Sequence, residues 1–135
     1  MANALYAKAR KKFLDADVDW SLDTIKCVLV DTADYTVNLT THEFLSDVPL
    51  AARVATSSAF TVKTSDNGIA DAADITFTAV SGDTSEALVI YKDTGDAATS
   101  PLIAYIDVAT GLPVTPTGGN IDVTFDNGPN KIFKL

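Results

Sequence analysis

Short stretches of alternating apolar and polar residues recur along this chain, and this two-residue period is typical of β-strands. In one of them Ile75, Phe77 and Ala79 alternate with threonines, so one face of that strand should be apolar and the other hydroxyl-rich. Most of these stretches are separated by turns that contain glycine. The pattern predicts seven strands, over residues 24–30, 53–63, 75–79, 87–92, 102–108, 121–125 and 131–135.

Only two helical segments are predicted, and both are short. The first covers residues 3–14, with Asn3 as N-cap and apolar residues at four-residue spacing: Leu5, Ala9 and Phe13. The second is indicated by Thr40-Thr41-His42-Glu43, which has the S/T-x-x-E form of a capping box. It predicts a helical turn near residues 41–46.

These elements together predict a single, mainly β domain. A chain of 135 residues can bury a sizeable core without disulfides. No crossover helices separate the later strands, which disfavours a parallel α/β fold and favours an antiparallel β-sandwich, jelly-roll or Ig-like. We expect a helical arm over residues 1–14 and a β domain over residues 24–135. The lone Cys27 alternates with Ile25 and Leu29, so it should be a buried apolar residue.

Charge is distributed unevenly around a net value of −8. Four of the ten basic residues are Lys8, Arg10, Lys11 and Lys12, whereas residues 13–130 carry a net −14. A body this acidic should repel nucleic acid. The N-terminus has neither a signal-peptide pattern nor a long apolar run, so we expect no membrane segment and synthesis in the cytoplasm.

The segment DADVDWSLD, residues 15–23, resembles the start of a calcium loop. An EF-hand needs glycine at position 6 and a bidentate glutamate at position 12, and here these positions hold Trp20 and Lys26. We therefore expect an acidic turn with Trp20 packed on the core. Many other aspartates lie in turns, where their carboxylates can bond nearby backbone. A calcium ion bound by turn aspartates at the surface remains an alternative.

Candidate chemistry is otherwise sparse. His42 and Cys27 are the only residues of their types, which is too few for a zinc site, and no motif supports a Ser-His-Asp triad. The sequence predicts no catalytic residue, metal or cofactor, and hence a non-enzymatic protein. A hydrolase of cell-wall sugars would need two carboxylates facing each other across a groove, and this alternative stays open.

Four long stretches carry a resemblance to a known family: MANALYAKARKKFL, VDTADYTVNLTTHEFLSDVP, ADAADITFTAVSGDTSEALVIYKDTG and LIAYIDVATGLPVTPTGGNIDVTFDNGPNKIFKL. Together they resemble small virion structural proteins of tailed bacteriophages. The resemblance implies a virion protein made in the host cytoplasm that acts in many copies, as a capsid decoration (cement) protein bound to the major capsid protein or other virion proteins. It further implies a homo-oligomer, with a trimer favoured. The alternative is a tail, neck or fibre component that forms a collar or binds a host receptor.

Charge and apolar patterning suggest two places for the partner contact. One is the N-terminal segment, whose removal should weaken particle binding, and the other is the last strand. The candidate contact residues are Leu5, Tyr6, Lys8, Arg10, Lys11 and Lys12 in the first, and Phe133 and Leu135 in the second.

Overall fold

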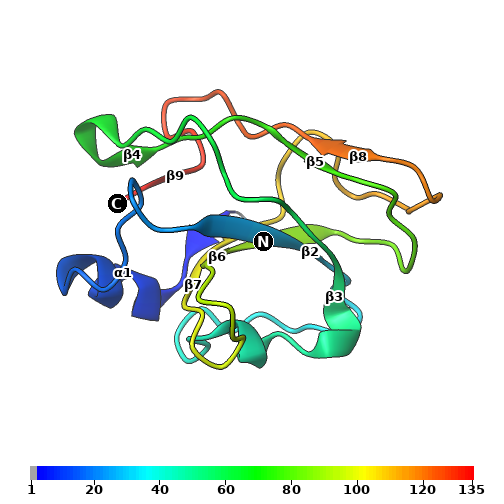
Figure 1. Cartoon of the computed structure of the whole chain (residues 1–135), viewed down its shortest axis with the longest axis horizontal. Helices are drawn as coiled ribbons and strands as arrows, with labels where there is room; N and C mark the ends of the chain where they lie inside the picture. The colour runs from blue at the N-terminus through cyan, green and yellow to red at the C-terminus, as the bar shows by residue number, and fades with distance from the viewer. Residues whose placement is uncertain (1–2) are drawn as a thin grey trace.

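The computed structural model describes residues 3–135, and its named strands all pair antiparallel. The prediction of a mainly β, antiparallel fold is therefore confirmed. A five-stranded sheet with strand order β1-β7-β6-β2-β3 lies at the centre (Figure 1). Its strands are β1 (Ala4–Leu5), β2 (Ile25–Val30), β3 (Arg53–Thr56), β6 (Ala87–Lys92) and β7 (Leu102–Ile106).

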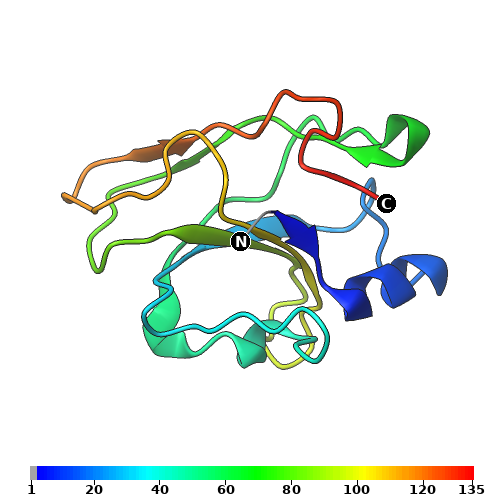
Figure 2. The same cartoon turned by 180° about the vertical axis from the view of Figure 1, so that it is seen from behind.

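Different structures cover the two faces of this central sheet (Figures 1 and 2). Two small sheets lie over one face: β4 (Ile69–Ala70) pairs with β9 (Phe133–Lys134), and β5 (Ile75–Phe77) pairs with β8 (Ile121–Val123). The other face is covered by segment 31–52, which includes two 3-10 helices, η1 (Leu45–Asp47) and η2 (Leu50–Ala52). A third, η3 (Asp66–Gly68), precedes β4.

Burial on both faces explains why the central strands are almost continuously apolar. In β2, Cys27 and Leu29 belong to the core under the small sheets, whereas Val28 and Val30 belong to the core under segment 31–52. All four are 0% exposed. Since a fully buried aliphatic side chain contributes about 1.5–3 kcal/mol, these strands supply much of the stabilisation. The predicted burial of Cys27 is confirmed.

Trp20 anchors the acidic turn to the core, as the sequence predicts. Its ring packs edge-on against Phe133 and Phe60, with centroids 5.3 and 6.0 Å apart. The indole Nε1–H donates a hydrogen bond to the carbonyl of Thr64 at 3.0 Å. Trp20 as a whole is 6% exposed.

The N-terminal helix begins later than predicted, and Asn3 is not its N-cap. Helix α1 spans Ala7–Leu14 and is capped by Tyr6 without a side-chain hydrogen bond. Residues 4 and 5 instead form β1 on the edge of the central sheet. The Asn3 amide holds this strand in place, because its Oδ1 accepts the N–H groups of Asp107 and Val108. Strand pairing has overridden local helix propensity here.

The second helical turn also lies later than the capping box predicts. The Asn38 carboxamide oxygen accepts the N–H groups of Thr40 and Thr41, which makes a turn in place of a helix start. The 3-10 helix η1 follows at Leu45–Asp47. Its own Asp47 accepts the N–H groups of the two residues before the turn. The capping carboxylate is thus supplied from a position that the S/T-x-x-E pattern does not include.

Peripheral strands are shorter than predicted. Strand β3 ends at Thr56, although Ser57 and Phe60 continue alongside β2 by donating backbone hydrogen bonds to it. Strands β1 and β4 have two residues each and were not predicted.

None of the helices within residues 3–135 has the length and apolar character needed to cross a membrane.

Candidate functional site

The predicted contact residues divide into buried and exposed groups. Leu5, Tyr6 and Phe133 are at most 9% exposed and belong to the cores, so their side chains are occupied within the chain. Tyr6 is therefore a poor candidate for direct contact with a partner, and Leu5 and Phe133 can offer only the small part of their surface that stays exposed. The residues of the predicted set that remain exposed are Lys8, Arg10, Lys11 and Leu135.

Two of the four N-terminal basic residues form ion pairs within the chain. Lys12 lies 2.9 Å from the Glu43 carboxylate and 5.1 Å from the centre of the Phe44 ring, and its side chain is 16% exposed. Lys11 pairs with Asp15 one helical turn away at the surface. Lys12 therefore ties α1 to segment 31–52. Lys8 and Arg10 have no ion-pair partner among residues 3–135.

A buried chain of hydroxyl groups fastens the start of α1 to segment 31–52. Tyr6 Oη lies 2.9 Å from Tyr35 Oη, which lies 2.8 Å from His42 Nδ1. The backbone N–H of Asn38 also donates to His42 Nδ1, so this nitrogen accepts and Tyr35 is its donor. Burial raises the pKa of Tyr35 to about 12 and that of Tyr6 further. His42 therefore has a structural role in this network.

A groove of about 450 Å³ separates the N-terminal strand from the C-terminal strand. One side is formed by Asn3 and β1 together with Arg10 and Val108, and the other by Asp126 and residues 130–134 around β9. Leu5, Ile132 and Phe133 are buried and form its apolar floor. The two segments proposed from the sequence as alternative contact regions therefore line the same groove.

The groove is positively charged on an otherwise acidic molecule. Its lining includes Arg10, Lys131 and Lys134 against the single carboxylate of Asp126, a formal net charge of +2. Arg10 and Lys134 are exposed and without an ion-pair partner in the described part of the chain. In sequence, Lys131 and Lys134 are isolated and give no signal of a patch. Only folding brings them beside Arg10.

Three acidic side chains form the one group in residues 3–135 with the geometry to hold a metal ion. One carboxylate oxygen from each of Asp31, Asp34 and Asp83 lies within 4.8 Å of the others. Such oxygen ligands suit Ca²⁺. However, the buried Asp31 already accepts the N–H of Ala33 at 2.9 Å, the bond of an Asx turn. Turn formation is therefore a sufficient explanation for this aspartate.

In the acidic segment 15–23, two of the four carboxylates accept hydrogen bonds from backbone N–H groups of the same segment. Asp19 Oδ1 accepts the N–H groups of Ser21 and Leu22, and Asp23 Oδ2 accepts the N–H of Asp19 at 2.7 Å. Asp23 also pairs with Lys92 at 3.1 Å. These bonds are those of a stabilised turn, as the sequence predicts.

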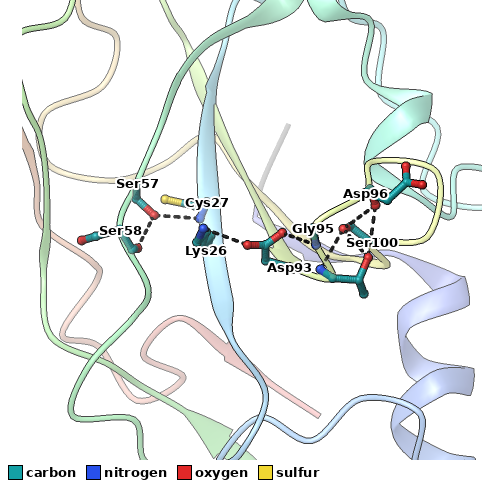
Figure 3. A network of polar contacts seen from close by, with 9 residues as sticks. Lys26, Cys27, Ser57, Ser58, Asp93, Gly95, Asp96 and Ser100 are labelled. Carbon is teal, nitrogen blue, oxygen red and sulfur yellow. Dashed lines mark hydrogen bonds and ion pairs between the residues drawn. The ribbon is translucent and has the colours of Figure 1, made fainter.

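Polar residues around β2 and the loop before β7 form a structural network (Figure 3). Lys26 Nζ lies 2.8 Å from Asp93, and this ammonium, with the N–H of Gly95, holds the Asp93 pKa below its usual range. Close by, the Ser57 hydroxyl accepts the N–H of Cys27 and donates to the carbonyl of Ser58. Within residues 3–135 no carboxylate or imidazole hydrogen-bonds to this hydroxyl, so the described part of the chain gives it no general base of the kind that a nucleophilic serine needs.

Comparison with known proteins gives no family assignment. The chain matches no protein-family model and no functionally curated protein.

Proposed function

We propose that this chain is a non-enzymatic structural protein of tailed-phage virions, a capsid decoration protein that binds the assembled head. Its partner would be the major capsid protein or another virion protein, and trimers are the favoured form. We also propose that the central and small sheets form a β-sandwich, jelly-roll or Ig-like. The observation that carries the functional proposal is the cationic groove between β1 and β9 on a chain whose formal net charge is −8.

This charge arrangement supports a molecule with two different sides. A cationic groove can face the particle, while the acidic remainder faces solvent and keeps assembled particles apart. A protein that binds only the assembled lattice stabilises it by mass action. If the bound form is an oligomer, several weak contacts add through effective concentration. No chemical step is required of such a protein, only a folded body and a contact surface.

Binding to particles tests the proposal directly. Heads that lack this chain should be mixed with the purified protein, sedimented, and analysed for bound protein and for resistance to heat. We expect saturable binding, on the order of hundreds of copies per head, and later release of DNA on heating. No binding to heads would refute the proposal. A small fixed number confined to one vertex would favour the alternative of a tail or neck component.

Copy number in the native virion is the independent measurement. Quantitative mass spectrometry against the major capsid protein gives it without any reconstitution. A head decoration protein should be present in a simple ratio to the capsid subunits. A ratio typical of tail or fibre proteins would contradict the decoration role while leaving a virion role intact.

A further inference from the structure

We propose that the groove between β1 and β9 binds an extended, acidic segment of the particle protein on which this chain docks, and that the segment adds as a strand between these two edges. This inference rests on the proposed function for the source of the segment. Three features of the groove lining support it: two strand edges that pair with no other strand within residues 3–135, an apolar floor and a cationic rim.

The first feature is the free edge of β1. The Tyr6 N–H donates to the Ile103 carbonyl at 3.0 Å, so this N–H points toward β7. Leu5, one residue earlier, pairs with Ala104, and because successive peptide groups of a strand point in opposite directions, its N–H and C=O point away from β7. This edge of the central sheet can therefore accept another strand.

Strand β9 presents a second free edge. The Leu135 N–H donates to the Gly68 carbonyl at 2.9 Å, toward β4. Lys134 pairs with Ile69, and by the same alternation its peptide groups point away from β4. Because Leu5 and Lys134 both line the groove, an extended segment there can form main-chain hydrogen bonds on both sides.

The floor and rim determine which side chains the segment should carry. Leu5, Ile132 and Phe133 offer apolar surface, which suits one face of an extended segment. Arg10 and Lys134 are exposed at the rim and lack ion-pair partners among residues 3–135, so carboxylates on the other face would be favoured. Alternating apolar and acidic residues satisfy both requirements, since neighbouring side chains of a strand point to opposite faces.

A peptide titration followed by NMR tests the groove. The probe is a capped six-residue peptide of alternating Val and Glu, added to the ¹⁵N-labelled full chain, with the matching Val and Gln peptide as control. We expect a Kd on the order of 1 mM, with the largest amide shift changes at Leu5 and Lys134. The Gln peptide should bind at least about tenfold more weakly, because it lacks the charges that meet the rim.

Charge reversal provides test variants in the groove and a matched control, Lys8, on the same helix as Arg10. Arg10→Glu and Lys134→Glu should each weaken binding of the Glu peptide about tenfold or more, whereas Lys8→Glu, exposed on α1 outside the groove, should change it less than about twofold. All three positions are exposed, so their melting temperatures should match the wild type. Equal losses in Lys8→Glu and Arg10→Glu, or shift changes away from both edges, would overturn the inference. So would groove shifts that depend on protein concentration without peptide, because they would indicate a second copy as occupant.

Particle binding separates this inference from the proposed function. The double variant Arg10→Glu/Lys134→Glu should lose at least about tenfold in occupancy on heads that bind the wild type. If wild type and double variant bind heads equally, the groove is not the docking site although the decoration role stands. If the wild type fails to bind heads but the groove binds the Glu peptide, the decoration role fails and a different source must supply the segment.

Discussion

The hydroxyl chain from Tyr6 through Tyr35 to His42 predicts that one substitution lowers the stability of the wild type but raises the stability of a variant. Removing the Tyr6 hydroxyl (Tyr6→Phe) deletes one hydrogen bond and leaves Tyr35 still bonded to His42. The expected cost is about 1 kcal/mol, the usual net value of one such bond. Removing the Tyr35 hydroxyl deletes both bonds. It also leaves the Tyr6 hydroxyl without its hydrogen-bond partner, on a residue that is 0% exposed and cannot reach water.

We expect Tyr35→Phe to destabilise the fold by about 2–4 kcal/mol, because an unsatisfied buried hydroxyl costs about 1–3 kcal/mol beyond the lost bonds. In that background, Tyr6→Phe removes the unsatisfied group. The double variant Tyr6→Phe/Tyr35→Phe should therefore be more stable than Tyr35→Phe alone. Tyr6→Phe would then be destabilising in the wild type and stabilising in the Tyr35→Phe background.

Urea unfolding followed by Trp20 fluorescence measures all four proteins of this double-mutant cycle, and thermal unfolding by circular dichroism checks the order. Each kcal/mol should lower Tm by about 3–5 °C in a chain of this size. Equal m-values are needed to attribute the changes to the folded state. Additive costs, or a Tyr35→Phe variant no less stable than Tyr6→Phe, would show that the two hydroxyls do not act as one network.

Three further predictions concern separate parts of the fold. Because burial raises the pKa of the Cys27 thiol, an aromatic disulfide reagent at pH 8 should label this cysteine only after unfolding, and rapid labelling of the native protein would contradict the burial. Gly111→Ala should cost at least about 2 kcal/mol more than Gly95→Ala in urea unfolding: both glycines have positive φ, but only at Gly111 would the new Cβ lie 2.5 Å from the Asp122 carbonyl oxygen. Asp47→Asn should cost about 1 kcal/mol at pH 7. Two backbone N–H groups hold the Asp47 pKa below its usual range, so this contribution is present above the unfolded pKa of about 3.9 and is lost as pH falls through the folded value. The stability difference between wild type and Asp47→Asn should therefore shrink below about pH 4, and a constant difference would contradict the assignment.

The central strands were predictable because their local pattern and their tertiary surroundings agree. Strand β6 matches the predicted bounds 87–92, and β2 begins one residue inside the predicted 24–30. Their apolar runs, bounded by turns, are required by burial on both faces of the sheet. The strand at residues 4–5 could not be predicted in this way, since two residues carry no period. It exists because β7 offers an edge and Asn3 holds the chain against that edge.

The groove could be predicted only in part. A clustered charge near the N-terminus and an apolar last strand each indicated a contact region, but nothing in the sequence places residues 3–5 opposite residues 130–134. That arrangement depends on β9 pairing with β4 and β1 pairing with β7, both contacts between distant parts of the chain. The burial of Leu5 and Tyr6 could not be predicted from the sequence either, because apolar residues near a terminus are compatible with a binding arm as well as with a core.

The same burial determines which experiment can identify the contact residues. Deleting residues 1–14 would remove the basic residues, but also β1 and the buried Leu5, Tyr6 and Ala9. Three buried side chains at about 1.5–3 kcal/mol for each large one are comparable with the whole stability of a domain of this size. Such a deletion would unfold the chain, and loss of particle binding would follow whatever the groove does. Arg10→Glu compared with Lys8→Glu keeps the core intact and changes only the position of one charge relative to the groove.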